Sequence, residues 1–410
     1  MVQVKKKFTF IDLFAGCGGL SEGFYKQGYK ALAHVEINPV ACETLKERML
    51  YYGYNDVEKA VLNVDITRPD ILECIDEVVS GQKVDIIIGG PPCQAYSSLG
   101  KAKDDNAMQN DPRNFLFENY VKVLEHYRPK FFVFENVLGM LSARVNGELI
   151  VNRIIKGLGN QYKVIFDPNI NVLNSANYGV PQIRKRVIIL GVRKDLEIIP
   201  EDIYKSIKKT HYDPEMEDGQ RKKLKKYVTV QDAIGDLPKL VPGAGSKTIQ
   251  HSYKRDNDFL KLMGSDENSV LMDHVARNHN DKDILRYKEM AKNHWTFKEL
   301  LEKRPDLRHE KARVFGNSYV VQWWDLPSKT IIAHLYKDGN QFIHPDAEQG
   351  RTITVREAAR LQSFPDDFVF CGSRTDQYKQ IGNAVPPLFA EAIAKGMRKH
   401  LLSLDRENKK

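Results

Sequence analysis

Short apolar runs rich in β-branched side chains recur through residues 8–193, and longer mixed segments separate them. Such a run is typical of a buried strand, and its alternation with longer segments is typical of β-α-β units. These units build an open, mostly parallel sheet with helices on both faces. The rhythm therefore predicts an α/β fold. The expected strands are residues 8–12, 32–37, 61–66, 84–88, 131–134 and 187–192, and the first expected helices are 20–27 and 39–50.

The amino-acid composition changes after about residue 193. Eight of the 11 histidines lie in residues 194–350, whereas all 5 cysteines lie outside that range, and the β-α rhythm is lost there. Residues 381–400 then end in an amphipathic helix, with apolar side chains at helical spacing. These shifts predict a first domain at 1–193, a second domain at 194–375 and a closing segment at 376–410.

The charge and the cysteine content exclude several classes of protein. The formal net charge of +8 and the isoelectric point near 8.9 favour a polyanionic partner, although many basic enzymes bind no nucleic acid. An odd number of cysteines without a Cys-x-x-Cys pair argues against a disulfide framework and against a metal site of the zinc type. The sequence has neither a signal-peptide core nor about 18 consecutive apolar residues, so a cytoplasmic protein without a membrane span is expected.

A glycine-rich segment, Asp-Leu-Phe-Ala-Gly-Cys-Gly-Gly at 12–19, lies between the first expected strand and helix. Its glycines allow a tight turn and a close approach of backbone to ligand beside a helix N-terminus, but their spacing departs from Gly-x-Gly-x-x-Gly. Glu36 ends the second strand and Asp65 has the matching place on the third, where carboxylates accept hydrogen bonds from ribose hydroxyls. The alternative is a structural turn with two surface acids. The two acids together favour an adenosine-type cofactor.

The strand expected at 84–88 leads into Gly-Gly-Pro-Pro-Cys-Gln at 89–94. Open α/β sheets bind ligands at the carboxyl edge, where this loop would present the Cys93 thiol. Two prolines remove backbone freedom immediately before the thiol, which suits a nucleophile in a defined position. A lone cysteine is more often a small buried hydrophobic residue. That alternative does not require the Pro-Pro-Cys-Gln setting, and we interpret Cys93 as a candidate nucleophile.

The strand expected at 131–134 ends in Glu135. The segment 113–126 before it is long enough for the crossover helix of a β-α-β unit, so this strand and the one before Cys93 are expected to be neighbours. Paired strands lie about 4.8 Å apart, which would bring Glu135 within the width of a small ring of Cys93. Glu135 could instead cap a following helix, but a cap does not explain this alignment.

Basic residues precede the last expected strand, in Gln-Ile-Arg-Lys-Arg at 182–186. An extended backbone would put Arg184 and Arg186 on one face. Their guanidinium groups could bind a phosphate, a base edge or a neighbouring carboxylate. Such a stretch is more often a run of solvated charges, so this motif supports a functional site only in combination with the other motifs.

In this order the segments resemble the motifs of the cytosine-C5 DNA methyltransferase family. The resemblance covers about residues 8–193 and 328–397, and the stretch between them is where that family holds its variable target-recognition region. The matching segments are the S-adenosylmethionine loop at 14–19, the nucleophile loop at 91–94, the Glu-Asn-Val segment at 135–137, the arginine motif at 182–186 and two C-terminal motifs at 351–365 and 380–386.

The resemblance implies a Rossmann-like, S-adenosylmethionine-dependent methyltransferase domain, a smaller target-recognition domain that binds DNA, and a C-terminal helix that returns to the first domain. A cytosine flipped out of double-stranded DNA would receive the methyl group at C5. The Cys93 thiolate would attack C6 while Glu135 protonates or hydrogen-bonds N3. Arg186, with Arg184 nearby, would hold the base and the Glu135 carboxyl. Water would remove the C5 proton before the cysteine leaves.

The same resemblance implies S-adenosylmethionine as cofactor, S-adenosylhomocysteine as product, and no metal. Ile37 stands where many family members carry an aromatic residue, so weaker stacking on the adenine is expected. The residues expected to contact the cofactor are Phe14, Gly16, Gly18, Leu20, Glu36, Ile37, Asp65, Pro92, Asn383 and Val385. Those expected to contact DNA are Gln94, Ser97, Lys101, Lys103 and Arg113.

A monomeric bacterial enzyme of the restriction-modification type is expected, and a cognate restriction endonuclease acting on the same site is compatible with it. One alternative is a tRNA-methylating relative, but those proteins carry a Cys-Phe-Thr tripeptide, and no cysteine occurs here between 94 and 370. Amino-group DNA methyltransferases would have Tyr or Trp after Pro92. A catalytically inactive, DNA-binding homologue is the other alternative, and it would have lost the thiol, the acid or the glycines.

Overall fold

The computed structural model describes residues 8–92, 115–145, 147–213, 223–252, 257–264, 268–308 and 319–407. The chain forms two compact units and passes between them more than once. The first unit contains Met1–Tyr178, Lys185–Lys209 and Pro387–Lys410, and the second contains Gly179–Arg184 and Thr210–Pro386. None of the described helices is long and apolar enough to cross a membrane.

The borders of the units fall later than the composition indicated. The border expected at 193 falls at 209, because helix α8 (Pro200–Ser206) packs on the last strand of the first unit and on its C-terminal helix α15 (Pro387–Glu407). The border expected at 375 falls at 386, because α14 (Arg374–Asn383) packs on the 3-10 helix η7 (Ala333–Tyr336) of the second unit. The contact is close: a Cβ on Gly382 would lie 2.2 Å from the backbone nitrogen of Ala333.

The first unit is built on an 8-stranded sheet in the order β3-β2-β1-β4-β5-β10-β8, with β9 paired to β10. Strands β3, β2, β1, β4 and β5 are parallel neighbours, whereas β10 is antiparallel to β5, β8 and β9. The expected mostly parallel α/β sheet is therefore confirmed. The strands are β1 (Thr9–Leu13), β2 (Lys30–Glu36), β3 (Val61–Asn63), β4 (Ile86–Gly89), β5 (Phe131–Asn136), β8 (Tyr162–Val164), β9 (Val172–Asn174) and β10 (Lys185–Arg193).

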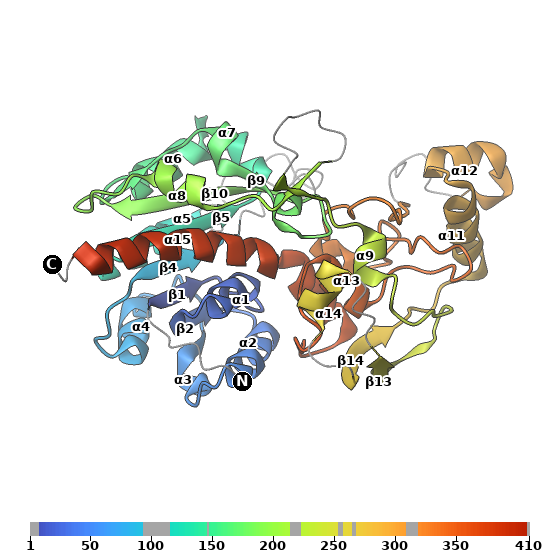
Figure 1. The fold of residues 1–410 in the computed structure, drawn as a ribbon, viewed down its shortest axis with the longest axis horizontal. Coiled ribbons are helices and arrows are strands. Elements are labelled where there is room, and N and C mark those ends of the chain that lie inside the picture. The colour runs from blue at the N-terminus through green and yellow to red at the C-terminus, as the bar shows by residue number, and fades with distance from the viewer. Residues whose placement is uncertain are drawn as a thin grey trace. The chain divides into compact units, whose positions relative to one another are not determined.

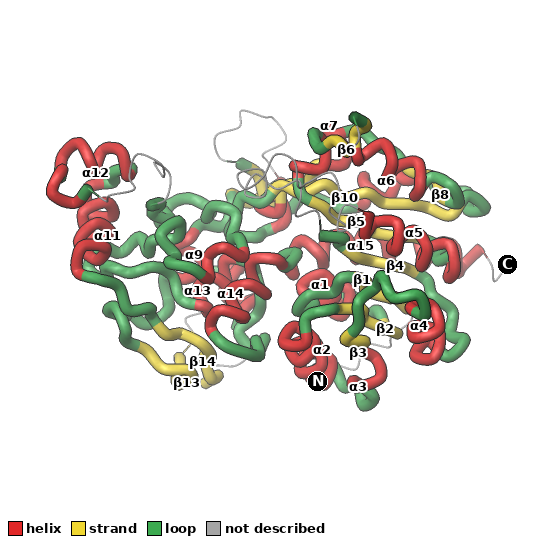
Figure 2. Tube along the Cα trace, turned by 180° about the vertical axis from the view of Figure 1, so that it is seen from behind, coloured by secondary structure: helices red, strands yellow, loops and turns green. Residues whose placement is uncertain are grey.

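Helices cover both faces of this sheet (Figures 1 and 2). On one face α4, α5 and α6 pack on a continuous apolar core, to which β1 contributes Ile11 and Leu13. Because side chains alternate along a strand, Asp12 points to the opposite face, where it meets α1. Further helices and a small hairpin complete the unit: α1 (Gly19–Lys26), α2 (Pro39–Tyr51), α3 (Val57–Ala60), α4 (Ile71–Val79), α5 (Leu116–Tyr127), α6 (Ile150–Leu158), α7 (Pro168–Asn171), the 3-10 helices η3 (Leu138–Leu141) and η4 (Ser175–Tyr178), and β6 (Arg144–Val145) with β7 (Glu148–Leu149).

Helix α15, from the C-terminal end of the chain, packs against α1 from its start, and Figure 1 shows it lying along the sheet. At the closest approach, a Cβ on Gly23 would lie 2.2 Å from the backbone nitrogen of Glu391. The Tyr29 hydroxyl donates to the carbonyl of Ala394 at 3.0 Å, and the Gln27 amide donates to the Glu391 carboxylate at 2.9 Å. The two helices therefore approach each other this closely because Gly23 has no side chain.

The second unit contains shorter elements. Strands β13 and β14 form an antiparallel two-stranded ribbon, and β11 pairs with β12 in parallel. The elements are β11 (His211–Tyr212), β12 (Lys225–Lys226), α9 (Val230–Ile234), β13 (Gly245–Ser252), α10 (Asp258–Met263), β14 (Asn268–Val275), α11 (Asp281–Asn293), α12 (Phe297–Lys303), the 3-10 helices η6 (Pro305–Leu307) and η7, α13 (Val355–Leu361) and α14.

Buried ion pairs hold α13 within the second unit. Arg351 donates to the two carboxylate oxygens of Glu357 at 2.8 and 2.7 Å, and both side chains are buried. Arg360, fully buried, donates to Asp366 at 2.9 Å and also to Asp236. Removing one partner of such a pair leaves an uncompensated buried charge. The acidic and basic residues of the 351–365 motif therefore stabilise the second unit from inside.

We predict opposite effects of alanine at two helical glycines of the first unit. Gly23→Ala should lower the free energy of unfolding by about 1–3 kcal/mol, because the methyl group would push α15 away from α1. Gly157→Ala, in α6, should raise it by about 0.5–1 kcal/mol, because there a Cβ meets only Val121 at 3.4 Å. Chemical unfolding of both variants measures the difference, and equal shifts would contradict the close helix contact.

Candidate active site

The glycine-rich loop between β1 and α1 has an unusual backbone. The φ angles of Phe14, Gly16 and Gly18 are 59°, 56° and 87°, in the left-handed region that favours glycine. A Cβ on Gly18 would lie 2.7 Å from Cδ2 of Leu45, whereas a Cβ on Gly16 would meet no described atom within 4 Å. The backbone of the loop therefore faces open space at Gly16, where a ligand could approach it closely.

Glu36, the last residue of β2, is bonded to this loop. Its Oε2 accepts the N–H of Gly16 at 2.8 Å, and its Oε1 accepts the N–H of Asn38 at 2.8 Å. Burial raises the pKa of the Glu36 carboxyl. The next side chain, Ile37, is 63% exposed. Two neighbouring residues thus offer a ligand different contacts: the Glu36 carboxylate can accept hydrogen bonds from hydroxyl groups, and Ile37 presents an exposed apolar side chain.

Asp65 lies just beyond the end of β3, the strand next to β2. Its Oδ1 accepts the N–H and the hydroxyl of Thr67 at 2.9 and 2.8 Å, and the residue is exposed. The two acids singled out in the sequence therefore do follow adjacent parallel strands. Leu20, also expected at the cofactor, is a buried residue of α1.

A buried polar network next to the loop was missed by the sequence analysis. The Ser21 hydroxyl donates to Asp12 Oδ2 at 2.5 Å and lies 3.1 Å from His34 Nε2, and the Tyr25 hydroxyl lies 2.9 Å from the same nitrogen. Burial raises the pKa of Asp12 to about 8 and lowers that of His34 to about 3. Both groups are therefore largely uncharged near neutral pH. The available signal was the presence of Asp12 and His34 inside otherwise apolar strands.

The loop after β4 is anchored to the end of β5. The Asn136 amide donates to the carbonyl of Pro91 at 3.2 Å. A Cβ on Gly90 would lie 2.8 Å from Oε2 of Glu135, so the absence of a side chain there leaves room for the carboxylate. Pro92, which is half-buried, is the last described residue of this loop.

The remaining residues of the loop lie outside the described residues. Cys93 is the first of them, and its assignment as nucleophile stays a prediction. The same holds for the expected DNA contacts Gln94, Ser97, Lys101, Lys103 and Arg113.

Arg186 supports the carboxylate of Glu135. Its Nε lies 3.1 Å from Glu135 Oε1, and the two side chains are 12% and 13% exposed. Burial lowers the pKa of the Arg186 guanidinium, and the Glu135 carboxylate acts in the opposite direction. The pairing of Gly89 with Phe134 confirms that the strands leading to Cys93 and Glu135 are parallel neighbours.

The direction of β10 brings the arginine to this position. Val187 of β10 pairs with Asn136 at the end of β5, so the start of β10 lies at the carboxyl edge of the parallel strands. A parallel strand at this place in the sheet would begin at the opposite edge. The antiparallel arrangement, which the β-α rhythm did not predict, is therefore what pairs Arg186 with Glu135.

Arg184, predicted to lie beside Arg186, has a different environment. It belongs to the second unit, where its guanidinium donates to the carbonyls of Ile331 at 2.7 Å and Gly382 at 3.2 Å. Strand β10 begins at Lys185, so of the two arginines only Arg186 belongs to it. These two contacts are structural ones within the second unit, and the catalytic role expected for Arg184 stays a prediction.

Two of the expected cofactor residues, Asn383 and Val385, belong to the second unit. Asn383 is the exposed last residue of α14, and Val385 is buried in the short link to α15. Gln362 donates to the carbonyl of Ile381 at 2.6 Å and thereby holds the end of α14. Their contact with a cofactor stays a prediction.

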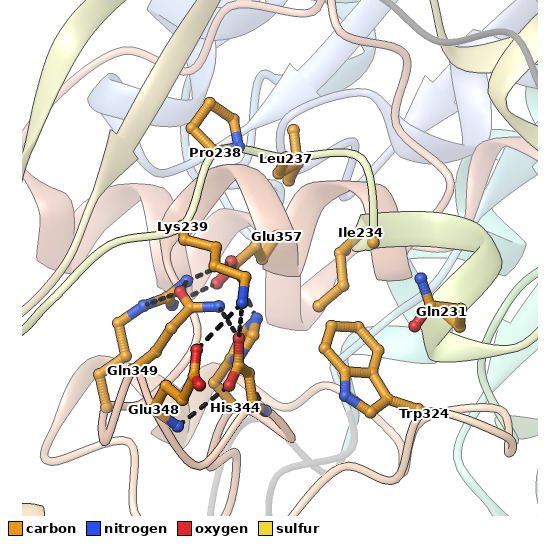
Figure 3. Close-up of a pocket in the computed structure, with 13 residues that line it drawn as sticks. Gln231, Ile234, Leu237, Pro238, Lys239, Trp324, His344, Glu348, Gln349 and Glu357 are labelled. Carbon is orange, nitrogen blue, oxygen red and sulfur yellow. Dashed lines mark hydrogen bonds and ion pairs between the residues drawn. The ribbon is translucent and has the colours of Figure 1, made fainter.

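The second unit also contains a cavity of about 450 Å³ (Figure 3). Lys239 lies at its rim, with Nζ 3.2 Å from both Asp346 Oδ2 and Glu348 Oε2. The rings of Trp324 and His344 meet edge to face, with centroids 5.3 Å apart. The charged side chains on its walls pair with one another, and no predicted site residue of the described part lines it. We assign it no ligand.

The strand order places the glycine loop and the loop before Cys93 together. Strands β2 and β3 lie on one side of β1 in the sheet, and β4 and β5 lie on its other side. The strand order therefore reverses between β1 and β4. Open α/β sheets bind ligands at such a point of reversal. The open backbone at Gly16, the carboxylates of Glu36 and Asp65, and the exposed Ile37 fit the adenosine portion of a cofactor. These features are those of an α/β fold with a candidate ligand site at the point where the strand order reverses.

Comparison with known proteins identifies the family. The family model described as C-5 cytosine-specific DNA methylase matches residues 8–399, and the chain belongs to this family. Type II methyltransferase M.Bpa9945I of Bacillus paralicheniformis is 35% identical, over 95% of this chain and 98% of that protein. Type II methyltransferase M.DdeI of Desulfomicrobium norvegicum is 34% identical, over 94% of this chain and 87% of that protein.

A solved structure agrees with this assignment. A protein described as a DNA modification methyltransferase encoded within a prophage (E. coli) superposes with a TM-score of 0.68 and 25% identity, over 96% of this chain and 99% of that chain. The enzyme is thus a DNA cytosine-C5 methyltransferase of the Type II restriction-modification kind. The tRNA-methylating and the inactive alternatives are not favoured by these relatives.

We predict a pH-dependent effect of Asp12→Asn. The folded protein keeps the Asp12 proton to a higher pH than the unfolded chain, whose aspartates have pKa values of about 3.9. The wild type therefore loses stability through this residue as the pH rises from about 4 to about 8. The Asp12→Asn variant has no such proton, so its free energy of unfolding relative to wild type should rise over this range.

Chemical unfolding at several pH values between about 5 and 8 measures this difference. Asp56→Asn, at an exposed position, controls for the substitution itself. Parallel pH profiles for Asp12→Asn and the wild type would contradict a raised pKa at Asp12.

Proposed function

We propose that the enzyme methylates C5 of a cytosine flipped out of a specific double-stranded DNA site, through a transient bond between the Cys93 sulfur and C6 of the base. The observation that carries this proposal is the Arg186–Glu135 pair at the end of β5. It lies directly beside the loop that leads to Cys93, because Gly90 lies against the Glu135 carboxylate. Nucleophilic attack on a pyrimidine ring requires a nucleophile and, close to it, an acid in a fixed position.

The pyrimidine ring must be activated in two places. When the Cys93 thiolate forms a bond to C6, the π electron pair of the C5–C6 bond moves to the C4–C5 bond and the pair of the C4–N3 double bond moves to N3, which makes C5 nucleophilic. Glu135 protonates or hydrogen-bonds N3, which stabilises the negative charge that develops in the ring. Arg186 orients the Glu135 carboxyl through the 3.1 Å contact between its Nε and Oε1. A flipped base is necessary because C6 cannot be reached in a stacked duplex.

S-adenosylmethionine, when bound, supplies the methyl group that C5 takes up. The backbone at Gly16, which faces open space, would lie close to it. Glu36 and Asp65 would accept hydrogen bonds from its ribose hydroxyls and other donor groups. Ile37 would pack on its adenine ring. Phe14, Gly18, Leu20, Pro92, Asn383 and Val385 are proposed as further contacts.

Release of the product needs a base and the departure of the thiolate. We assign the removal of the C5 proton to water. The electron pair of the C5–H bond restores the C5–C6 double bond, the bond between C6 and the Cys93 sulfur breaks to return the thiolate, and N3 gives its proton back to Glu135. Cys93 is therefore regenerated and acts as a covalent catalyst.

The biological role that we propose is protection of host DNA. The named relatives are Type II methyltransferases, and the enzyme would mark the site that a cognate endonuclease cleaves. We propose that a monomer binds double-stranded DNA, with Lys101, Lys103 and Arg113 at phosphates and with Gln94 and Ser97 at the flipped base.

We predict that Gly16→Ala weakens cofactor binding, whereas Gly53→Ala destabilises the fold by a similar amount without this effect. Gly16 and Gly53 both have positive φ, 56° and 77°, and a Cβ on either would meet no described atom within 4 Å. Alanine at either position should therefore cost about 1–2 kcal/mol of stability through backbone strain. Isothermal titration should show at least about tenfold weaker S-adenosylmethionine binding for Gly16→Ala only. Equal affinities of the two variants for S-adenosylmethionine would contradict a role of the glycine-rich loop in cofactor binding.

We predict that Glu135→Gln slows methylation by about 100-fold to 10,000-fold while cofactor affinity is retained, because proton donation to N3 is lost. Cys93→Ser should abolish methylation. Bisulfite sequencing of plasmid DNA from expressing cells locates the methylated site, and single-turnover assays give the rate. Glu73→Gln, at an exposed position in α4, is the matched control.

Oligonucleotides with 5-fluorocytosine at the target test the covalent bond, because fluorine at C5 blocks the final elimination. The wild type should remain attached to this DNA after denaturation, and Cys93→Ser should not. Absence of any trapped complex with an active wild type would overturn the covalent mechanism.

A further inference from the structure

The ribbon β13–β14 is a distinct element of the second unit. Within the part of the chain that the structure describes, its strands pair only with each other. The pairing runs from Gly245 opposite Val275 to Ser252 opposite Asn268. Figure 1 shows the ribbon beside α13 and α14. Two paired strands are about 4.8 Å apart, so the ribbon is a narrow arm.

One end of this arm is anchored in the core of the second unit. The buried His274 lies 3.1 Å from the Thr354 hydroxyl and 2.9 Å from the carbonyl of Pro238. The fully buried Arg356 donates from Nε to the carbonyl of Met272 at 2.9 Å. Asp273, between these anchors, is buried with a left-handed φ of 61°. A strained residue persists only where its surroundings determine the backbone, so this end of the ribbon is rigidly held.

Beyond the anchors, one face of the ribbon is open. Thr248 pairs with Met272 and Gln250 pairs with Val270, so these four side chains share a face. Thr248 and Gln250 are exposed, Val270 is 40% exposed and Met272 is half-buried. Leu271, on the other face, is fully buried. Among the described side chains of the ribbon, none of the exposed ones is a carboxylate.

This combination of side chains has a specific chemistry. A glutamine amide can donate to and accept from the N6 and N7 atoms of adenine together, and a threonine hydroxyl serves as donor or acceptor to any base. Val270 and the Thr248 methyl group offer apolar contacts of the kind that a thymine methyl group makes. Lys and Arg, which bind phosphates through their charge, do not occur among the described side chains of this face.

We propose that the β13–β14 ribbon enters the major groove of the target DNA, and that Gln250, supported by Thr248 and Val270, reads an A·T base pair of the recognition site. The major groove, about 12 Å wide, accommodates a two-stranded ribbon. The absence of an exposed carboxylate on the described ribbon avoids repulsion by the phosphates that border the groove. This inference rests on the proposed methylation of a specific DNA site and names the residues that select it.

Lys247 supplies an internal comparison. It is exposed and adjacent to Thr248, but successive strand residues point to opposite faces, so it does not belong to the face that carries Gln250. A lysine there can contact a phosphate, which contributes affinity without sequence selection. Substitution of Gln250 should therefore change the selection of the DNA sequence, whereas substitution of Lys247 should change the affinity for DNA.

The experiment compares the DNA sites that purified, full-length variants methylate on a plasmid, read by bisulfite sequencing. Gln250→Ala should methylate additional sites that differ from the wild-type site at one A·T pair. The ratio of kcat/KM between the cognate and the near-cognate site should fall about tenfold to a hundredfold. Lys247→Ala should keep the wild-type site, bind DNA more weakly at every site and show a salt dependence reduced by about one phosphate contact.

Gln341→Ala is the matched control, because Gln341 is an exposed glutamine of the same unit outside the ribbon. It should leave the discrimination ratio unchanged, and cofactor titration with each variant verifies that it is folded. A wild-type ratio in Gln250→Ala would overturn the proposal. A change in oligomeric state by light scattering, without a change in site discrimination, would identify the face as a protein contact and would also overturn it. If the wild type itself marks no defined site, the proposed function fails instead.

Discussion

The reversal of strand order between β1 and β4 organises the first unit. On each side of the reversal a glycine without a side chain lies against a glutamate from the neighbouring strand. Gly16 donates its N–H to Glu36 at the end of β2, and Gly90 leaves room for the carboxylate of Glu135 at the end of β5. One acid is thereby held where the cofactor is proposed to bind, and the other beside the loop that leads to Cys93. Side chains at either glycine would displace an acid or close the space that a ligand needs.

The segment at 182–186 contributes to both units. Gln182 accepts the N–H of Ile331 at 2.9 Å and Arg184 donates to the carbonyl of the same residue, so the first half of the segment is part of the second unit. Arg186, two residues later, pairs with Glu135 in the first unit. The first half of the motif is therefore part of the second unit, and its second half supports Glu135, the proposed catalytic acid. A substitution of Arg184 should act through the stability of the second unit.

Much of the sheet could be predicted from the sequence because its strands are local apolar runs, and the neighbouring positions of β4 and β5 followed from the length of the crossover between them. The direction of β10 could not, because pairing with β5, β8 and β9 is decided by contacts between distant segments. The place of Arg184 was missed for the same reason, since its partners lie about 150 and 200 residues further along the chain. The network of Asp12 and Ser21 was missed because a polar residue in an apolar run does not reveal its partner.

The packing of α15 on α1 has a consequence for biosynthesis. The ribosome makes α1 before the second unit and α15 after it, so the surface of α1 that α15 covers stays exposed until α15 has been synthesised. The first unit can therefore complete its packing only after the second unit has been synthesised. A nascent polypeptide that stalls before residue 387 would expose apolar surface to chaperones and proteases. Only chains translated through this helix would become competent to modify the genome.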